Sequence, residues 1–268
     1  MKGVSTVDFA FKEHYNVYDL VEIVKKLRAP DGCPWDKVQT HESIRNDFIE
    51  EVYEAVEAID EKDTDHLREE LGDVLLQVVF HSVLETEQKH FTIDEVADDV
   101  CKKMILRHPH VFGSIVAETP EEVIKNWDQI KMETHSQTTA SQAMEGVSKA
   151  LPSLIRSKKL WKKAESGGAA LADEKAAVDL TQQKLAVLSD VVAKKNSEEY
   201  ERALGELLFS VVGLSRFLHT DSEESLYRAC DAFIARFRAL ETEAASQDTD
   251  IQNLSSEEIA KLWNQTLS

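Results

Sequence analysis

The sequence has little glycine, proline or cysteine. Only 9 Gly, 5 Pro and 3 Cys occur in 268 residues. All-β architectures need glycine and proline at frequent turns, so this composition favours helices. The three cysteines, Cys33, Cys101 and Cys230, are far apart and form no C-x-x-C pair. This pattern argues against a disulfide framework and a thiolate zinc site, and it fits a reducing cytoplasm.

Long hydrophobic runs are also missing. No segment approaches the ~20 apolar residues that a membrane-spanning helix requires. The N-terminal stretch does not combine a basic region with an apolar run, as a secretion signal would. The sequence therefore predicts neither membrane insertion nor secretion.

Basic residues are also few compared with acidic residues. The chain has 31 Lys and Arg against 50 Asp and Glu, which gives a formal net charge of -19. Such a chain repels nucleic-acid backbones at long range, so nucleic acid is not expected as a partner. An acidic protein can still bind a small phosphorylated ligand when divalent cations bridge its carboxylates to the phosphates.

Helical periodicity is present over most of the sequence. Apolar residues at spacings of three and four predict helices in both halves, and a Ser-, Thr- and Gln-rich stretch separates the halves. The length also favours two domains. We expect domains at 1–133 and 149–268, joined by a linker at 134–148. The expected helices lie at 17–27, 43–60, 66–85, 93–107, 120–132, 176–195, 197–218 and 222–244.

The two halves contain a faint internal repeat. Residues 71–79 (LGDVLLQVV) parallel residues 204–212 (LGELLFSVV), and each segment lies in a long predicted helix that follows another helix after a short turn. The repeat predicts that the halves are copies of one helical unit.

Four acidic residues share helix flanks in the first half. If Phe48, Val52, Ala55 and Ile59 form the core stripe of the helix at 43–60, the 3.6-residue period places Glu51 and Glu54 together beside it. The same rotation in the helix at 66–85 places Glu70, Asp73 and Gln77 on one flank.

These four carboxylates can converge on a hard cation. A short turn makes the two helices antiparallel neighbours, and Mg²⁺ prefers oxygen ligands. Gly72, in the middle of the second helix, predicts close approach of a partner helix. Spacing alone leaves open the commoner alternative of solvated acidic surfaces. Glu50 rotates away from the core side and is either exposed to solvent or a group that activates water.

The acidic residues carry a recognisable pattern. Residues 50–54 (EEVYE) followed by 70–73 (ELGD) resemble the E-E-x-x-E and E-x-x-D signature of MazG-type pyrophosphohydrolases. The similarity in order and spacing extends to 27–36, 107–112 and 127–131. It is strong over 18–133 and weak over the remainder.

The resemblance implies an all-α fold of two tandem MazG-like units of four-helix-bundle type, the second degenerate, in a homodimer. It implies Mg²⁺-dependent hydrolysis of nucleoside triphosphates, NTP or dNTP, to nucleoside monophosphate and pyrophosphate, with Mn²⁺ as a substitute cation. Such an activity cleans the nucleotide pool. By residue matching, the catalytic group is Glu50, Glu51, Glu54, Glu70 and Asp73, of which the last four are the metal ligands.

The same matching assigns four substrate contacts. Lys103 and Arg107 match positions that contact the triphosphate, where they would neutralise charge that the metal leaves uncovered. Trp127 and Lys131 match a further stretch, in which the ring could stack on a base while the amine meets phosphate. For Trp127, core packing is an equal alternative.

The second half departs from the pattern. Gln182, Gln183, Ala186 and Ala203 replace the acidic residues and leave only Glu206. One carboxylate cannot hold Mg²⁺, so this half is expected to be a structural or dimerisation unit. Two alternatives to the function remain: a base-specific dUTP- or dCTP-type hydrolase, and a non-catalytic helical nucleotide-binding regulator.

Overall fold

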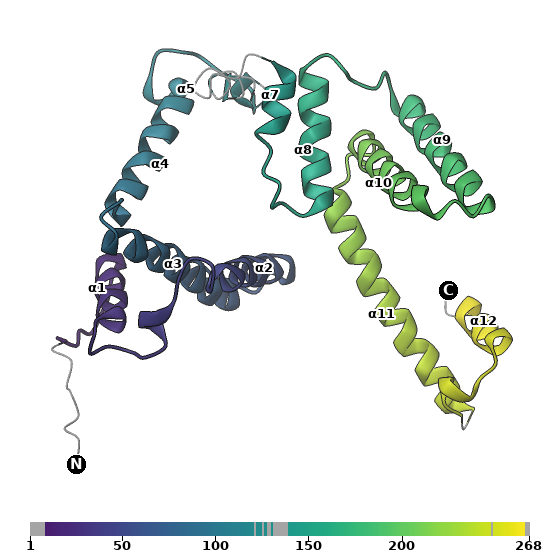
Figure 1. Cartoon of the computed structure of the whole chain (residues 1–268), viewed down its shortest axis with the longest axis horizontal. Helices are drawn as coiled ribbons and strands as arrows, with labels where there is room; N and C mark the ends of the chain where they lie inside the picture. Colours follow the sequence, from purple (N-terminus) through teal and green to yellow (C-terminus); the bar gives the residue numbers. More distant parts are fainter. Residues whose placement is uncertain are drawn as a thin grey trace. The chain divides into compact units, whose positions relative to one another are not determined.

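The computed structural model describes residues 9–120, 122–124, 126–127, 130, 139–247 and 249–265 (Figure 1). Every regular element in these residues is helical, and none of them belongs to a β-strand. The prediction of an all-α fold is therefore confirmed. The chain divides into two compact units, Met1–Ile130 and Lys131–Ser268.

The first unit has five labelled α-helices and one 3₁₀ helix. Its first four helices start and end within two residues of the predicted bounds. Residues 120, 122–124, 126–127 and 130 of the predicted helix at 120–132 are helical too, and its other residues lie outside the described set. The elements are α1 (Val17–Arg28), η1 (Asp36–Val38), α2 (Arg45–Glu61), α3 (Thr64–Glu87), α4 (Ile93–Arg107) and α5 (Pro109–Phe112).

Helices α2 and α3 form a tight antiparallel hairpin. Lys62 ends α2 in the left-handed conformation, with φ 59°, and its backbone N–H donates to carbonyl groups of the last turn. Asp63 then caps α3, because its side chain accepts hydrogen bonds from the backbone N–H groups of Asp65 and His66. The two-residue connection fixes this end of the hairpin.

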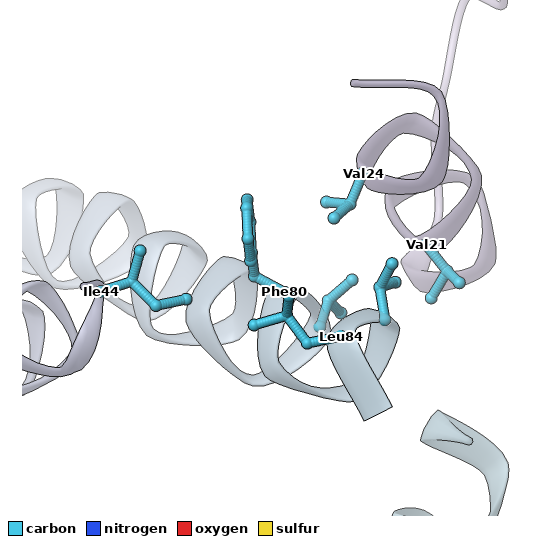
Figure 2. Packing of buried hydrophobic residues seen from close by; sticks show 7 residues of the cluster. Val21, Val24, Ile44, Phe80 and Leu84 are labelled. Carbon is cyan, nitrogen blue, oxygen red and sulfur yellow. The ribbon is translucent and has the colours of Figure 1, made fainter. Parts of the chain in front are cut away.

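The hydrophobic core of the first unit lies between α1 and the C-terminal half of α3. Figure 2 shows Val21 and Val24 of α1 facing Phe80 and Leu84 of α3. Ile44, just before α2, completes this cluster together with two further valines of α3. The packing anchors α3, which carries two of the predicted metal ligands.

The predicted core stripe of α2 is only partly buried. Ala55 is buried, whereas Val52 and Ile59 are 43% and 56% exposed. The buried positions of α2 are Ala55 and Ala58, because small residues let α2 lie close against α3. The larger apolar side chains of α2 point outward, which leaves an apolar outer face: Ile49, Val52, Tyr53, Val56 and Ile59.

The second unit repeats the hairpin arrangement. Helices α9 and α10 are joined by a short connection and are the most extensively packed helix pair of this unit. Residues 204–212 lie in α10 and residues 71–79 lie in α3, so the arrangement is compatible with the predicted repeat. The elements are α7 (Ala140–Glu145), α8 (Ser153–Ser166), α9 (Glu174–Ala193), η2 (Ser197–Glu199), α10 (Tyr200–Phe217), α11 (Ser222–Ser246), η3 (Ile251–Asn253) and α12 (Ser256–Gln265).

Part of the predicted linker at 134–148 is helical. Residues 140–145 form α7, which begins with a capping box between Thr139 and Gln142. Ala143 and Val147 are 5% and 8% exposed. These two side chains and the cap stabilise a helix that the polar composition did not indicate. None of the described helices has the length and apolar character to cross a bilayer.

Gly213 of α10 allows close packing against α8. A Cβ atom at this position would lie 2.7 Å from a ring carbon of Trp161. We therefore expect Gly213→Ala to destabilise the protein by about 1–3 kcal/mol, the usual cost of overpacking. Urea or thermal unfolding of the whole chain measures this change.

Gly205 is the matched control for Gly213 in the same helix. A Cβ atom there would meet nothing within 4 Å. Gly205→Ala should stabilise the protein by about 0.5–1 kcal/mol, because alanine loses less backbone entropy in a helix. Equal effects of the two substitutions would contradict the packing of Gly213 on Trp161.

Candidate active site

The hairpin brings three of the predicted carboxylates together. Glu51 of α2 and Glu70 and Asp73 of α3 each offer an oxygen atom, and these three atoms lie within 4.8 Å of one another. Glu70 is 7% exposed, and the other two residues are half-buried. No second group of three possible metal ligands converges in this way in the described part of the chain.

Burial and mutual repulsion both disfavour negative charge in this cluster. Burial raises the pKa of Glu51, and the negative charges of Asp73, Glu54, Glu70 and Glu50 raise it further. Among the described residues, each charged neighbour that shifts the pKa of Glu51 is therefore acidic. A divalent cation would remove this repulsion, because it supplies the positive charge that the cluster lacks.

Two buried oxygen atoms on α3 have no hydrogen-bond partner. They are Oε2 of Glu70 and Oε1 of Gln77. The other oxygen of Glu70 lies 3.1 Å from Nε2 of His66. Leaving a carboxylate oxygen buried without a partner is costly, and a bound ion would supply the missing partner. The side chains present thus fit a hard cation such as Mg²⁺, which takes carboxylate and amide oxygens as ligands.

Glu54 and Glu50 lie beside the cluster rather than within it. Glu54 is half-buried one turn after Glu51, and its oxygen atoms do not belong to the converging group. Glu50 is exposed. Both carboxylates still act on Glu51 through their charge. The structure therefore brings three of the four predicted metal ligands into one group and places the fourth on the same helix flank.

The predicted substrate residues form a separate group. Lys103 is exposed on α4, and Cζ of Arg107, at the end of α4, lies 5.3 Å from the ring centroid of Trp127. The Trp127 ring also meets the ring of His108 edge-on, with centroids 4.9 Å apart. Nε of Arg107 is buried without a hydrogen-bond partner. Lys131 lies outside the described residues.

Helix α4 does not bring these cations to the carboxylates of the same chain. It contacts α3 and runs away from the α2–α3 hairpin (Figure 1). Neither Lys103 nor Arg107 is among the charges that shift the pKa of Glu51. The acidic cluster and the basic residues are therefore two separate groups within one chain.

The corresponding hairpin of the second unit neutralises its remaining acid. Glu206 accepts hydrogen bonds from Lys184 and Arg202, both at 2.8 Å. Both hydrogen bonds lower the pKa of Glu206, and the bond from Lys184 has the larger effect. An open pocket of about 690 Å³ adjoins this ion pair and is lined by Trp161 and Phe209 among others. Cations of the chain itself thus face the one acid that the repeat retains.

Gln77 and His66 adjoin the acidic cluster, although neither is among the predicted site residues. His66 precedes Glu70 by one helical turn, and Gln77 follows Asp73 by one turn. Helical spacing places Gln77 on the flank of Glu70 and Asp73, and the same spacing could have identified His66, because residues four apart share a helix face. Gln77 is also a buried polar residue within an apolar stretch of α3.

The raised pKa of Glu51 makes the metal-free cluster unfavourable at neutral pH. A carboxyl group whose pKa is higher in the folded state favours folding at pH values below its unfolded pKa of about 4.5, and this contribution is lost as the pH rises through the folded pKa. In chelator at pH 7.5, we therefore expect Glu51→Gln to raise the melting temperature by about 2–4 °C. Added Mg²⁺ should stabilise the wild type more than this variant.

Differential scanning calorimetry with EDTA and with Mg²⁺ measures both effects. Glu57 is exposed on α2, so Glu57→Gln is the matched control. It should change neither the melting temperature in EDTA nor the stabilisation by Mg²⁺. A metal-free Glu51→Gln variant that melts below the wild type would contradict the destabilising effect of burial and repulsion on the charged Glu51 carboxylate.

Comparison with known proteins agrees with this geometry. Residues 39–112 match the model of the MazG nucleotide pyrophosphohydrolase domain. The matched segment contains α2 and α3 and therefore all the carboxylates of the cluster.

Similar full-length proteins extend the match beyond this domain. A Thermotoga maritima nucleoside triphosphate pyrophosphohydrolase/pyrophosphatase MazG is 38% identical over 91% of this chain and 93% of its own length. An Escherichia coli nucleoside triphosphate pyrophosphohydrolase is 34% identical over 92% of this chain and 95% of its own length. YabN, an uncharacterised Bacillus subtilis protein, is 39% identical over 91% of this chain and 50% of its own length. These matches confirm the resemblance seen in residues 50–54 and 70–73, and the chain belongs to the MazG nucleotide pyrophosphohydrolase family.

Proposed function

We propose that this chain is a Mg²⁺-dependent nucleoside triphosphate pyrophosphohydrolase. It hydrolyses NTP and dNTP to nucleoside monophosphate and pyrophosphate and so cleans the nucleotide pool. The observation that carries the proposal is the convergence of Glu51, Glu70 and Asp73, together with the buried Oε2 of Glu70, which has no hydrogen-bond partner among the described residues. The names of the Thermotoga and Escherichia relatives support the same reaction.

The carboxylates have distinct roles in the proposed reaction. Glu51, Glu70 and Asp73, together with Glu54 from the adjacent turn, hold the cation, for which Mn²⁺ can substitute. When bound there, Mg²⁺ neutralises charge on the triphosphate and lowers the pKa of a water molecule. Glu50, exposed beside Glu51, accepts the proton of the attacking water.

Basic and aromatic residues bind the rest of the substrate in this proposal. Lys103 and Arg107 contact the phosphates, and Lys131 adds a further cation. Trp127 orients Arg107 through the cation–π contact or stacks on the base. The three cysteines are free thiols, two of them exposed, which agrees with a reaction in the reducing cytoplasm.

A homodimer would bring the acidic cluster of one copy and the basic residues of α4 from the other copy together. The apolar outer face of α2 is exposed in the part of the chain that the structure describes, and an apolar face of this kind is typical of a subunit interface. We propose that a second copy packs on this face and that α4 of that copy supplies Lys103 and Arg107 to the carboxylates.

Substitutions at the carboxylates and at Lys103 should have different kinetic effects. Glu54→Ala or Asp73→Ala should lower kcat by about 100-fold or more, because each removes charge that holds the cation. Lys103→Ala should chiefly raise KM, by about 10-fold, because it removes one charge-assisted phosphate contact. Pyrophosphate release with saturating Mg²⁺ measures these constants.

Glu206→Gln in α10 is the matched control for these variants. Its ion pairs with Lys184 and Arg202 are remote in sequence from the site, so kcat and KM should remain those of the wild type. Wild-type rates in either acidic variant would overturn the assignment of metal ligands.

A panel of all NTPs and dNTPs, with and without Mg²⁺, separates the proposal from its alternatives. Release of pyrophosphate from many bases supports the house-cleaning activity. Release from dUTP or dCTP alone would indicate a base-specific hydrolase. Nucleotide binding without pyrophosphate release from any triphosphate would indicate a non-catalytic regulator.

The dimer can be tested on the outer face of α2. Val56 is 46% exposed in one chain. Val56→Asp would place a charge within the proposed interface, so we expect dissociation to monomers and loss of turnover. Sedimentation velocity measures the mass. Glu57→Lys, the exposed neighbour on the polar side, should leave a dimer, and a monomeric wild type would overturn the proposal.

A further inference from the structure

A series of short side-chain contacts links the segment before α2 to the C-terminal half of α3. Nε2 of His41 lies 2.6 Å from Oε1 of Glu85, and Nδ1 of His41 lies 2.6 Å from Nδ1 of His81. The other carboxylate oxygen of Glu85 lies 2.7 Å from Nδ1 of His90. The acidic cluster does not include any of these residues.

The geometry of the two imidazoles fits a shared proton. Their ring centroids are 4.9 Å apart, their Nδ1 atoms only 2.6 Å apart, and their planes are parallel within 2°. The rings of His41 and His81 therefore meet edge to edge, with the Nδ1 atoms pointing at each other. One nitrogen must donate and the other accept. A zinc ion would not fit between them, because a single Zn–N bond is about 2.0–2.1 Å long.

Glu85 determines the direction of this chain of hydrogen bonds. Its carboxylate accepts from Nε2 of His41, so a neutral His41 carries its proton on Nε2 and accepts from Nδ1–H of His81. Hydrogen bonds from His90 and then His41 lower the pKa of Glu85. Burial, and then the charge of His41, lower the pKa of His81.

The charged groups that face the pair come from three segments. Glu85 lies on α3 itself, and His90 lies in the loop after α3. Glu42 lies in the same segment as His41, and hydrogen bonds from its own backbone and Thr40, followed by the charge of His41, lower the pKa of Glu42. From α2, the aromatic ring of Phe48 meets His81, with centroids 5.5 Å apart.

This contact closes the open end of the α2–α3 hairpin. The turn at Lys62 joins the two helices at one end, and His41 meets His81 just before α2 begins at the other. Glu51 lies between these two points, as do Glu70 and Asp73 on the opposite helix. Any splaying of the open end would therefore change the separation of the carboxylates.

We propose that the His41–His81 pair, oriented by Glu85, is a positioning clamp that fixes the spacing of Glu51 from Glu70 and Asp73 and opens when both imidazoles are protonated. Two Nδ1–H groups would place two hydrogens in the gap between the rings, so the doubly protonated pair must separate. The catalytic consequence rests on the proposed function, whereas the clamp itself can be measured without turnover.

The pH dependence follows from the depressed pKa of His81. Because this pKa is lower in the folded protein than its ordinary value of 6.5, the clamp is fully formed above about pH 6.5. It is lost as the pH falls through the folded pKa. His81→Asn keeps an amide donor near the position of Nδ1 but does not titrate.

The experiment compares full-length wild type, His81→Ala, His81→Asn and the control His90→Ala. His90 contacts the same carboxylate but not the segment before α2. At pH 8, His81→Ala should raise the Mg²⁺ concentration for half-maximal pyrophosphate release by about 10-fold, the lower end of the cost of removing a group that orients metal ligands. His81→Asn should restore most of this loss, and His90→Ala should match the wild type.

The pH profile separates positioning from simple structural support. As the pH falls from 7.5 to 5.5, the Mg²⁺ requirement of the wild type should rise more than that of His81→Asn. The carboxylates titrate in both proteins, so the difference reports the imidazole pair. Identical pH profiles of the wild type and His81→Asn would overturn the clamp. This comparison does not need His81→Ala, so it tests the clamp even if that variant fails to fold.

Amide hydrogen exchange of the metal-free proteins gives a readout that does not need activity. The first turns of α2 should exchange faster in His81→Ala than in the wild type or in His90→Ala. Unchanged exchange in a folded His81→Ala would overturn the clamp. If the wild type releases no pyrophosphate from any triphosphate, the proposed function fails, while the exchange data still test the clamp.

Discussion

Repulsion between carboxylates that two packed helices hold together is the constraint on which the rest of the structure depends. Glu51, Glu70 and Asp73 converge with no basic residue among the charges that act on Glu51. The energy to hold them comes from elsewhere: the tight turn at Lys62, the alanines between α2 and α3, and the core that α3 shares with α1. A site of this kind gains stability when it binds a cation, so ligand binding and local folding are coupled.

The fold separates the two kinds of charge that a triphosphate requires. The carboxylates lie on the α2–α3 hairpin, while Lys103 and Arg107 lie on α4, which runs away from that hairpin (Figure 1). An apolar face that is exposed among the described residues lies on α2, the helix that carries Glu51. In the proposed dimer, one contact surface would both bury this face and bring cations to the acids, so that assembly and substrate binding use the same helices.

The sequence predicts local features well because helical periodicity reports local geometry. The bounds of α1 to α4, and the flank that Glu70 and Asp73 share on α3, follow from the 3.6-residue period. Periodicity identifies an apolar stripe but not what covers it, so it predicts core positions for Val52 and Ile59, which are exposed in one chain. The contact of His41 with His81 joins residues 40 positions apart, and no spacing rule predicts such a pair. Gly72 predicts close approach of a helix, but a Cβ atom there would meet nothing within 4 Å in one chain.

Because Glu206 is already ion-paired within the chain, the second hairpin needs no counter-ion from solution. Lys184 and Arg202 are covalently part of the chain, so α9 and α10 carry their own counter-ions at any concentration of free metal. With the proposed metal site, the rigidity of the α2–α3 pair would follow the supply of divalent ions, whereas that of the α9–α10 pair would not. Depletion of the metal would loosen only the half that uses it.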